Sequence, residues 1–165
     1  MQVERNSVWQ VTGIDGIKDD TYRVLEHDAS NDFLILFRLH DGNGLEKPVS
    51  VEFSIFLESA KCGNSKTSSY SIPFYQLISE EEISPAHLDK RNKRFELIQD
   101  LISNPNFLHD VVLNQRSKIV ASHAKERGVY VQKIYRSLNQ YWRYGQEINA
   151  LLPAYKHCGG SGKPR

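Results

Sequence analysis

The chain has 165 residues, of which 39% are hydrophobic and 25% charged, and its formal net charge is +1. These values are typical of soluble globular proteins. Charged residues interrupt every apolar stretch well before the roughly 20 residues that a membrane helix needs, and they also interrupt the amino-terminal segment. Composition and charge therefore exclude a membrane-spanning helix and a secretory signal peptide, and we expect a cytoplasmic protein.

The small net charge conceals a strong asymmetry along the chain. Residues 1–80 carry 7 Lys and Arg against 12 Asp and Glu, residues 81–113 carry 4 against 6, and residues 114–165 carry 10 against 2. The net charges of these segments are thus −5, −2 and +8. Such a concentrated basic segment is typical of a protein that binds a polyanion, although a solvated basic face would explain the charge alone equally well.

The first 80 residues predict a small β domain. Apolar stretches over 8–11, 22–25, 33–39 and 48–53 are separated by turn-forming Gly, Asp and Asn residues. Residues 53–58 could turn helical, and the polar stretch 62–71 predicts a surface loop. Four or five short antiparallel strands at this spacing suggest a small barrel-like domain or a curled sheet over residues 1–80.

The remainder of the chain predicts three helices. Ser84 and Pro85 supply a helix cap and a first-turn proline, and Asn104-Pro105 ends that helix. We expect Asn114 to cap a second helix that runs to Arg127, and a third helix to run from about Tyr130 to Arg143. Two helices joined by a turn at Gly128 predict a helix-turn-helix domain over 81–146, followed by a basic linker over 147–165. The fold class is therefore α+β.

The spacing around the turn supports the helix-turn-helix interpretation. Ala124 is small where two helices would cross, Gly128 can adopt the left-handed conformation, and Ile134 would anchor the third helix. On this third helix an apolar stripe faces away from a polar stripe made of Gln132, Arg136, Asn139 and Arg143, with Tyr135 at its edge. No acidic residue occurs between positions 127 and 146. Arginine pairs with guanine and Asn or Gln with adenine in the major groove of DNA, so the stripe predicts a DNA-reading surface.

The candidate DNA-binding residues divide by expected role. Arg136 is the first choice for a base contact, whereas Arg116 and Lys118 are expected to bind phosphates. We expect Tyr141 and Trp142 to pack in the core and His123 to be a partly buried helix residue. The full candidate set is Arg116, Lys118, Tyr130, Gln132, Lys133, Tyr135, Arg136, Asn139, Arg143 and Lys156.

No catalytic or metal site is expected in this chain. Its two cysteines, Cys62 and Cys158, lack partners at the spacing of metal ligands, and the acidic residues fall mostly in turns of the β region. We therefore expect no cofactor.

A longer pattern near the carboxyl end resembles one particular family. The string Tyr141-Trp142-Arg143-Tyr144-Gly145-Gln146, followed by Asn149 to Lys156, is similar to the TnsB transposases of heteromeric cut-and-paste bacterial transposons. Residues 8–11 and 20–25 resemble the opening strands of the same proteins.

The resemblance implies a specific role. It implies that this chain binds repeated duplex DNA sites at transposon ends, and that a separate catalytic domain, which holds two Mg²⁺ ions on three carboxylates, joins the strands. As that domain is not in this sequence, we expect no strand-transfer activity from this chain. The implied partners are transposon-end DNA, other transposition proteins and other TnsB protomers, in the bacterial cytoplasm on the nucleoid, with no membrane and no small molecule.

Two other functions fit the residues. A helix-turn-helix also serves transcriptional regulators, in which case the β segment would bind a ligand or form dimers. Alternatively, the acidic β domain over 1–80 could dock a protein of the transposition machinery.

Overall fold

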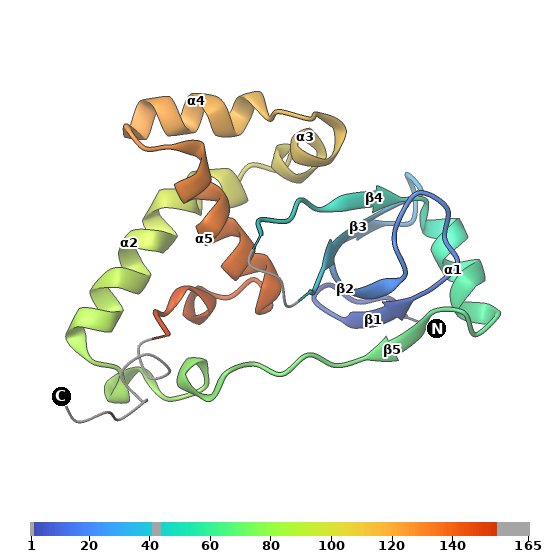
Figure 1. Ribbon diagram of the computed structural model, residues 1–165, viewed down its shortest axis with the longest axis horizontal. Helices are drawn as coiled ribbons and strands as arrows, with labels where there is room; N and C mark the ends of the chain where they lie inside the picture. Colours follow the sequence, from blue (N-terminus) through green and yellow to red (C-terminus); the bar gives the residue numbers. More distant parts are fainter. Residues whose placement is uncertain (1, 41–43, 155–165) are drawn as a thin grey trace.

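A computed structural model describes residues 2–40 and 44–154, and it is α+β as the sequence predicts (Figure 1). The five strands form one antiparallel sheet in the order β4-β3-β2-β1-β5. Their bounds are Val8–Val11 for β1, Asp20–Asp28 for β2, Phe33–Arg38 for β3, Val49–Val51 for β4 and Lys66–Ser68 for β5. Among the described residues β4 and β5 are the two edges of the sheet, so the sheet is open and, of the two predicted forms, it is not the barrel.

The sheet is hydrophobic on both faces because each face is covered. Helix α1 (Phe53–Lys61) packs against Leu34 and Leu36 of β3, whereas Ile35 and Phe37 contribute to the cluster formed by the helices that follow the sheet. Alternate residues of a strand point to opposite faces, so a strand covered on both sides is a continuous apolar run. This explains why β3 lacks the polar alternation of a half-exposed strand.

Four helices and three short 3-10 turns follow the sheet. The helices are α2 (Pro85–Ile102), α3 (Phe107–Leu113), α4 (Lys118–Arg127) and α5 (Val131–Arg143). The 3-10 turns are η1 (Phe74–Gln76), η2 (Glu80–Glu82) and η3 (Ile148–Leu151). In the described part of the chain, no helix combines the length and the apolar character needed to cross a bilayer.

Most predicted boundaries hold, and two are wrong. Ser84 caps α2 by accepting a hydrogen bond from the His87 amide, as expected. Asn114 does not cap the next helix: it ends α3, which the sequence reading missed, and Ser117 caps α4 by accepting from the Val120 amide at 3.1 Å. The predicted loop over 62–71 also contains β5, whose residues are exposed and therefore carry no hydrophobic pattern.

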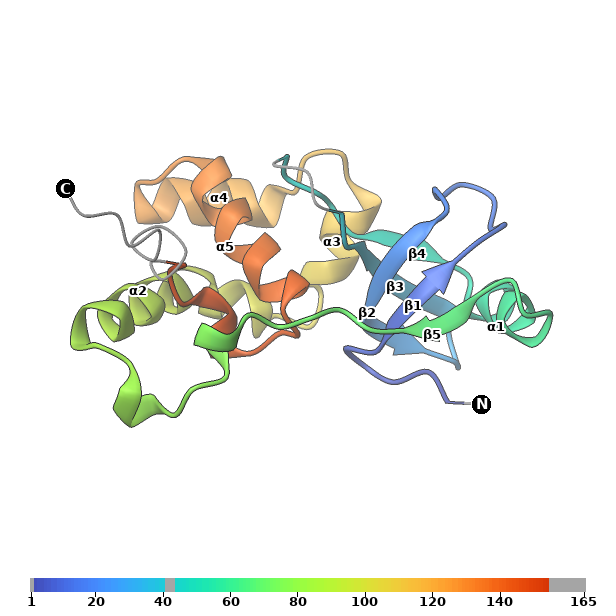
Figure 2. The same cartoon turned by 60° about the horizontal axis from the view of Figure 1, so that its bottom comes forward.

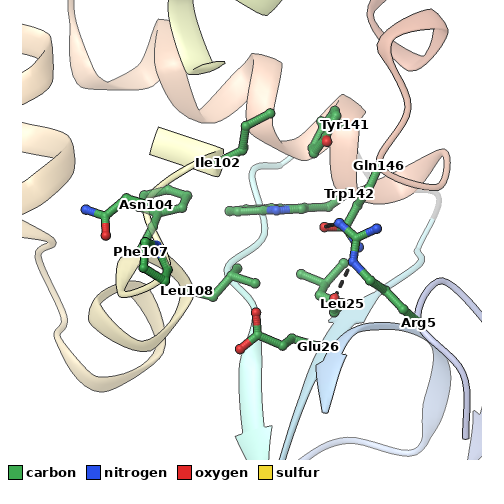
Figure 3. A pocket seen from close by; sticks show the side chains of 11 residues that line it. Arg5, Leu25, Glu26, Ile102, Asn104, Phe107, Leu108, Tyr141, Trp142 and Gln146 are labelled. Atoms are coloured by element: carbon green, nitrogen blue, oxygen red, sulfur yellow. Dashed lines mark hydrogen bonds between the residues drawn. The ribbon is translucent and has the colours of Figure 1, made fainter. Parts of the chain in front are cut away.

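The sheet and the helices share a hydrophobic core around Trp142. Its ring centroid lies 5.5 Å from that of Phe37 in β3 and 6.4 Å from that of Phe107 in α3. Figure 3 shows the Trp142 ring across a cavity of about 90 Å³ that Leu25 and Glu26 of β2 line from the sheet side. Figure 2 shows sheet and helices side by side, with the chain after β5 running along both. The proposed division into 1–80, 81–146 and 147–165 stays a prediction.

Polar contacts fasten the same junction. Arg23 of β2 donates to the carbonyl of Arg143 at 3.1 Å, at the end of α5, and to the carbonyl of Asn6 at 2.6 Å. Gln146 accepts from Arg5 at 2.9 Å and donates to the Asn6 side chain at 2.7 Å. The residues that follow α5, up to Gln146, therefore hold the helical part against the sheet.

Candidate nucleic-acid interface

Helices α4 and α5 form a helix-turn-helix. Gly128 ends α4 with φ of +67°, in the left-handed region that glycine adopts with little steric cost. The Val129 amide donates to the Ala124 carbonyl at 3.0 Å, and Ala124 and Ile134 are buried. The small, glycine and apolar residues thus occupy the positions that the sequence spacing predicts.

The first half of α5 presents an exposed polar face. Tyr130, the N-cap residue, is 84% exposed, and Gln132, Lys133 and Arg136 are exposed as well. The opposite side of the helix buries Ile134, Leu138, Tyr141 and Trp142, which confirms the expected core role of the last two aromatic residues. The exposed face near the N-terminus of α5 therefore carries cationic and amide side chains and no carboxylate.

The second half of the predicted stripe makes contacts within the protein. Asn139 is 6% exposed; its amide oxygen accepts from the Glu46 amide at 2.8 Å and its amide nitrogen donates to the Glu46 carbonyl at 3.1 Å. Arg143 is half-buried and donates to the His40 carbonyl at 2.8 Å. These two residues fasten the connection between β3 and β4 to α5, so the structure gives both of them a role in the fold.

Two further residues of α5, Tyr135 and Gln140, are partly exposed. Tyr135 is half-buried, and burial, followed by the nearby Asp110 carboxylate, raises the pKa of its phenol. Tyr135 packs against the hydrophobic core as a partly buried residue. Gln140 is partly exposed and lies one turn beyond Arg136, although the sequence reading did not select it.

The start of α4 carries the predicted phosphate contacts. Arg116 and Lys118 flank the buried cap residue Ser117, and both are exposed. Lys47, from the connection between β3 and β4, donates to the carbonyls of Asn114 and Gln115. The connection between β3 and β4 therefore contacts α5 through Asn139 and the start of α4 through Lys47. Lys156 lies outside the described residues.

Helix α2 brings further cations beside α5. An open groove is lined by Lys90, Lys93, Arg94 and Leu97 of α2 together with Lys133 of α5. The cations of α2 are visible in the sequence, but they lie about 40 positions before Lys133, and only packing shows that they adjoin α5.

Other expected residues are structural. His123 is 7% exposed and its Nε2 lies 2.6 Å from the Leu97 carbonyl, which confirms a buried helix residue. Within the described ranges no three His, Cys, Asp or Glu side chains gather as metal ligands would.

The fold and the site define a class of protein. Its members join an open antiparallel sheet to a helix-turn-helix whose second helix exposes basic and amide side chains. Residues 91–155 match the model of the family described as the TnsB second domain. The match includes α3, α4, α5 and most of α2.

A curated relative agrees with the family match. The chain is 30% identical over 94 residues to the transposon Tn7 transposition protein TnsB of Escherichia coli. The aligned part covers 56% of this chain and 13% of that protein, so the chain spans a small part of its relative. The resemblance to TnsB transposases that the sequence predicts is thus confirmed.

Proposed function

We propose that the chain binds duplex DNA sequence-specifically at the end repeats of a transposon, as the end-recognition part of a transposase. The observation that carries this proposal is the exposed, acid-free face on the first half of α5, formed by Gln132, Lys133 and Arg136. In helix-turn-helix proteins the second helix enters the major groove and its N-terminal residues contact base edges. The exposed half of α5 is the half that this geometry requires.

The residues of the proposed surface divide into two roles. Gln132 and Arg136 have the amide and guanidinium groups that pair with adenine and guanine edges. Lys133, Arg116 and Lys118 supply phosphate contacts, and the exposed hydroxyl of Tyr130 can donate to a phosphate at the entrance of the helix. In this proposal the chain recognises DNA and does not itself join strands.

The relationship to TnsB supports transposon ends as the target. The relative is a transposition protein by name, and the family match includes the whole helix-turn-helix. Binding at such sites places the chain on bacterial DNA beside other protomers of the same kind.

A selection experiment tests the proposal. The chain is used to enrich duplexes from a random pool, and its affinities for an enriched duplex and a scrambled one are compared at physiological salt. We expect tighter binding to the enriched duplex than to the scrambled one. If the chain makes about four phosphate contacts, a plot of the logarithm of the binding constant against the logarithm of the salt concentration should have a slope of about −3.6. Equal affinities would exclude specific recognition.

The arrangement of sites separates the proposal from a transcriptional regulator. In this proposal a transposon encodes the chain. Footprinting on the DNA of its two ends should show protected sites that are direct repeats of one another. A single palindromic site beside a promoter would instead support a regulator, since symmetric operators mirror a twofold dimer.

A further inference from the structure

The groove between α2 and α5 is a second cationic surface, separate from the start of α4. Lys90, Lys93, Arg94 and Leu97 are spaced by three to four residues and so lie along one side of α2, and Lys133 of α5 faces them. No acidic residue lines the groove. Lys90 and Lys93 are exposed; Lys93 also pairs with Asp89 of the same helix at 3.0 Å, in an ion pair that is exposed on both sides.

The groove continues the exposed face of α5. Lys133 belongs to both, because it lines the groove and lies one position from Gln132 and three from Arg136. On the opposite flank, α5 is fastened through Asn139 to Glu46, and Lys47 from the same connection contacts the segment before α4. Figures 1 and 2 agree that α5 lies between α2 on one side and the connection between β3 and β4 on the other.

The exposed half of α5 therefore has cations on two flanks. Arg116 and Lys118 lie at the start of α4, and Lys90 and Lys93 lie on α2. The major groove of B-DNA is about 12 Å wide and is bounded by two sugar-phosphate backbones. A helix inserted into it has one backbone on each side, so each cationic flank faces a different strand.

We propose that the α2 groove binds the sugar-phosphate backbone of the second DNA strand, with Lys90 and Lys93 as phosphate contacts. This inference rests on the proposed function, since it requires α5 to enter the major groove. It adds a binding surface formed by a helix outside the helix-turn-helix and commits to the same duplex as the occupant.

Arg94 supplies a fixed cation at the groove. Its guanidinium donates to the Leu151 carbonyl at 3.0 Å, which holds it in place. The fixed Arg94 and the exposed lysines thus match a phosphate chain that passes along α2.

A charge-neutralised variant of the full chain tests this inference. Lys90→Gln and Lys93→Gln are combined, and the control combines Lys61→Gln in α1 with Lys66→Gln in β5, which are exposed and distant from α5. Binding to the enriched and scrambled duplexes is measured over a range of salt concentrations. Ethylation interference on the enriched duplex locates the phosphates that each variant contacts on each strand.

The outcomes distinguish the inference from the function it rests on. For the Lys90/Lys93 variant, we expect the slope of log binding constant against log salt to become shallower by about 0.9 for each phosphate contact removed. Ethylation interference should disappear on one strand only. The preference for the enriched duplex should remain. The control should match the wild type. An unchanged slope and pattern, with specific binding by the wild type intact, would overturn the α2 inference alone. Failure of the wild type to prefer any duplex would overturn both.

Discussion

Arg136 is the side chain on which base recognition depends most directly. It is exposed, it lies one turn into α5, and its neighbours on the same face are Gln132 and Lys133. An arginine at this position can make two parallel hydrogen bonds to guanine through its planar guanidinium. Arg136 should therefore govern sequence preference, whereas the surrounding lysines govern affinity for any duplex.

Replacing Arg136 with alanine tests that division. We expect the affinity for the enriched duplex to fall by about 1–3 kcal/mol and the preference at one base position to relax. Competition titrations with duplexes altered at single positions measure both effects, and Lys61→Ala serves as the distant control. An equal loss on enriched and scrambled duplexes would show that Arg136 contacts phosphate instead.

Buried tyrosines should make the free energy of unfolding depend on pH in the alkaline range. Burial is the main cause that raises the pKa of Tyr22, Tyr135 and Tyr141 above the ordinary value of 10.0. A phenol with a raised pKa in the folded state holds its proton more tightly there than in the unfolded chain. This contribution to stability is complete below the unfolded pKa and is lost as the pH rises through the folded pKa.

The free energy of unfolding should therefore decrease as the pH is raised above 10.0, the ordinary pKa of these phenols. Urea denaturation on both sides of this pH measures the decrease. Tyr135→Phe removes one of the titrating groups and should show a smaller alkaline loss than the wild type. Equal losses in the two proteins would contradict a folded-state shift at Tyr135.

Helix α5 combines two tasks along its length. Its first half is exposed and available to DNA, and its second half is fastened to the sheet through Asn139 and Arg143. The contact to Glu46 satisfies a backbone amide and a backbone carbonyl at once, so it fixes both the helix and the connection between β3 and β4. A helix held at one end presents its other end in a defined orientation.

The variant Asn139→Ala separates the structural role from a base contact. Loss of its side chain leaves the Glu46 amide and carbonyl without these partners, so stability should fall by about 1–3 kcal/mol. Base preference should remain, because Asn139 does not reach the exposed face. Urea denaturation and duplex competition measure the two effects. As a control, Gln132→Ala should change stability by less than about 0.5 kcal/mol.

The sheet and the helical part are joined by one core. Trp142 is 1% exposed and packs between Phe37 of β3 and Phe107 of α3, while Arg23 and Gln146 add polar contacts across the same junction. A change at this junction should therefore affect both parts together.

Trp142→Ala should lower the stability of both parts in a single transition. Removal of a buried aromatic side chain costs about 3–5 kcal/mol. Denaturation followed by far-ultraviolet and near-ultraviolet circular dichroism should give coincident midpoints, both shifted relative to the wild type. Tyr130→Ala, at an exposed site, should leave the midpoints unchanged. Separate transitions for sheet and helices would contradict a shared core.

Local signals in the sequence were sufficient for the strands β1 to β4, for α2 and for the helix-turn-helix. Apolar spacing, the Ser84-Pro85 start and the left-handed glycine at 128 act within a few residues, so they can be read without knowing the fold. Arg116, Lys118, Gln132, Lys133 and Arg136 were selected in the same way, and they are exposed.

Packing between distant segments settled the rest. The polar strand β5 exists because β1 offers it an edge, and α3 was missed because its burial depends on the sheet and on Trp142. Asn139 has the same chemistry as a base-reading residue, and only its contact with Glu46, 93 positions away, assigns it to the fold. The period of a helix shows which residues share a face, but the partners that cover this face come from elsewhere in the chain.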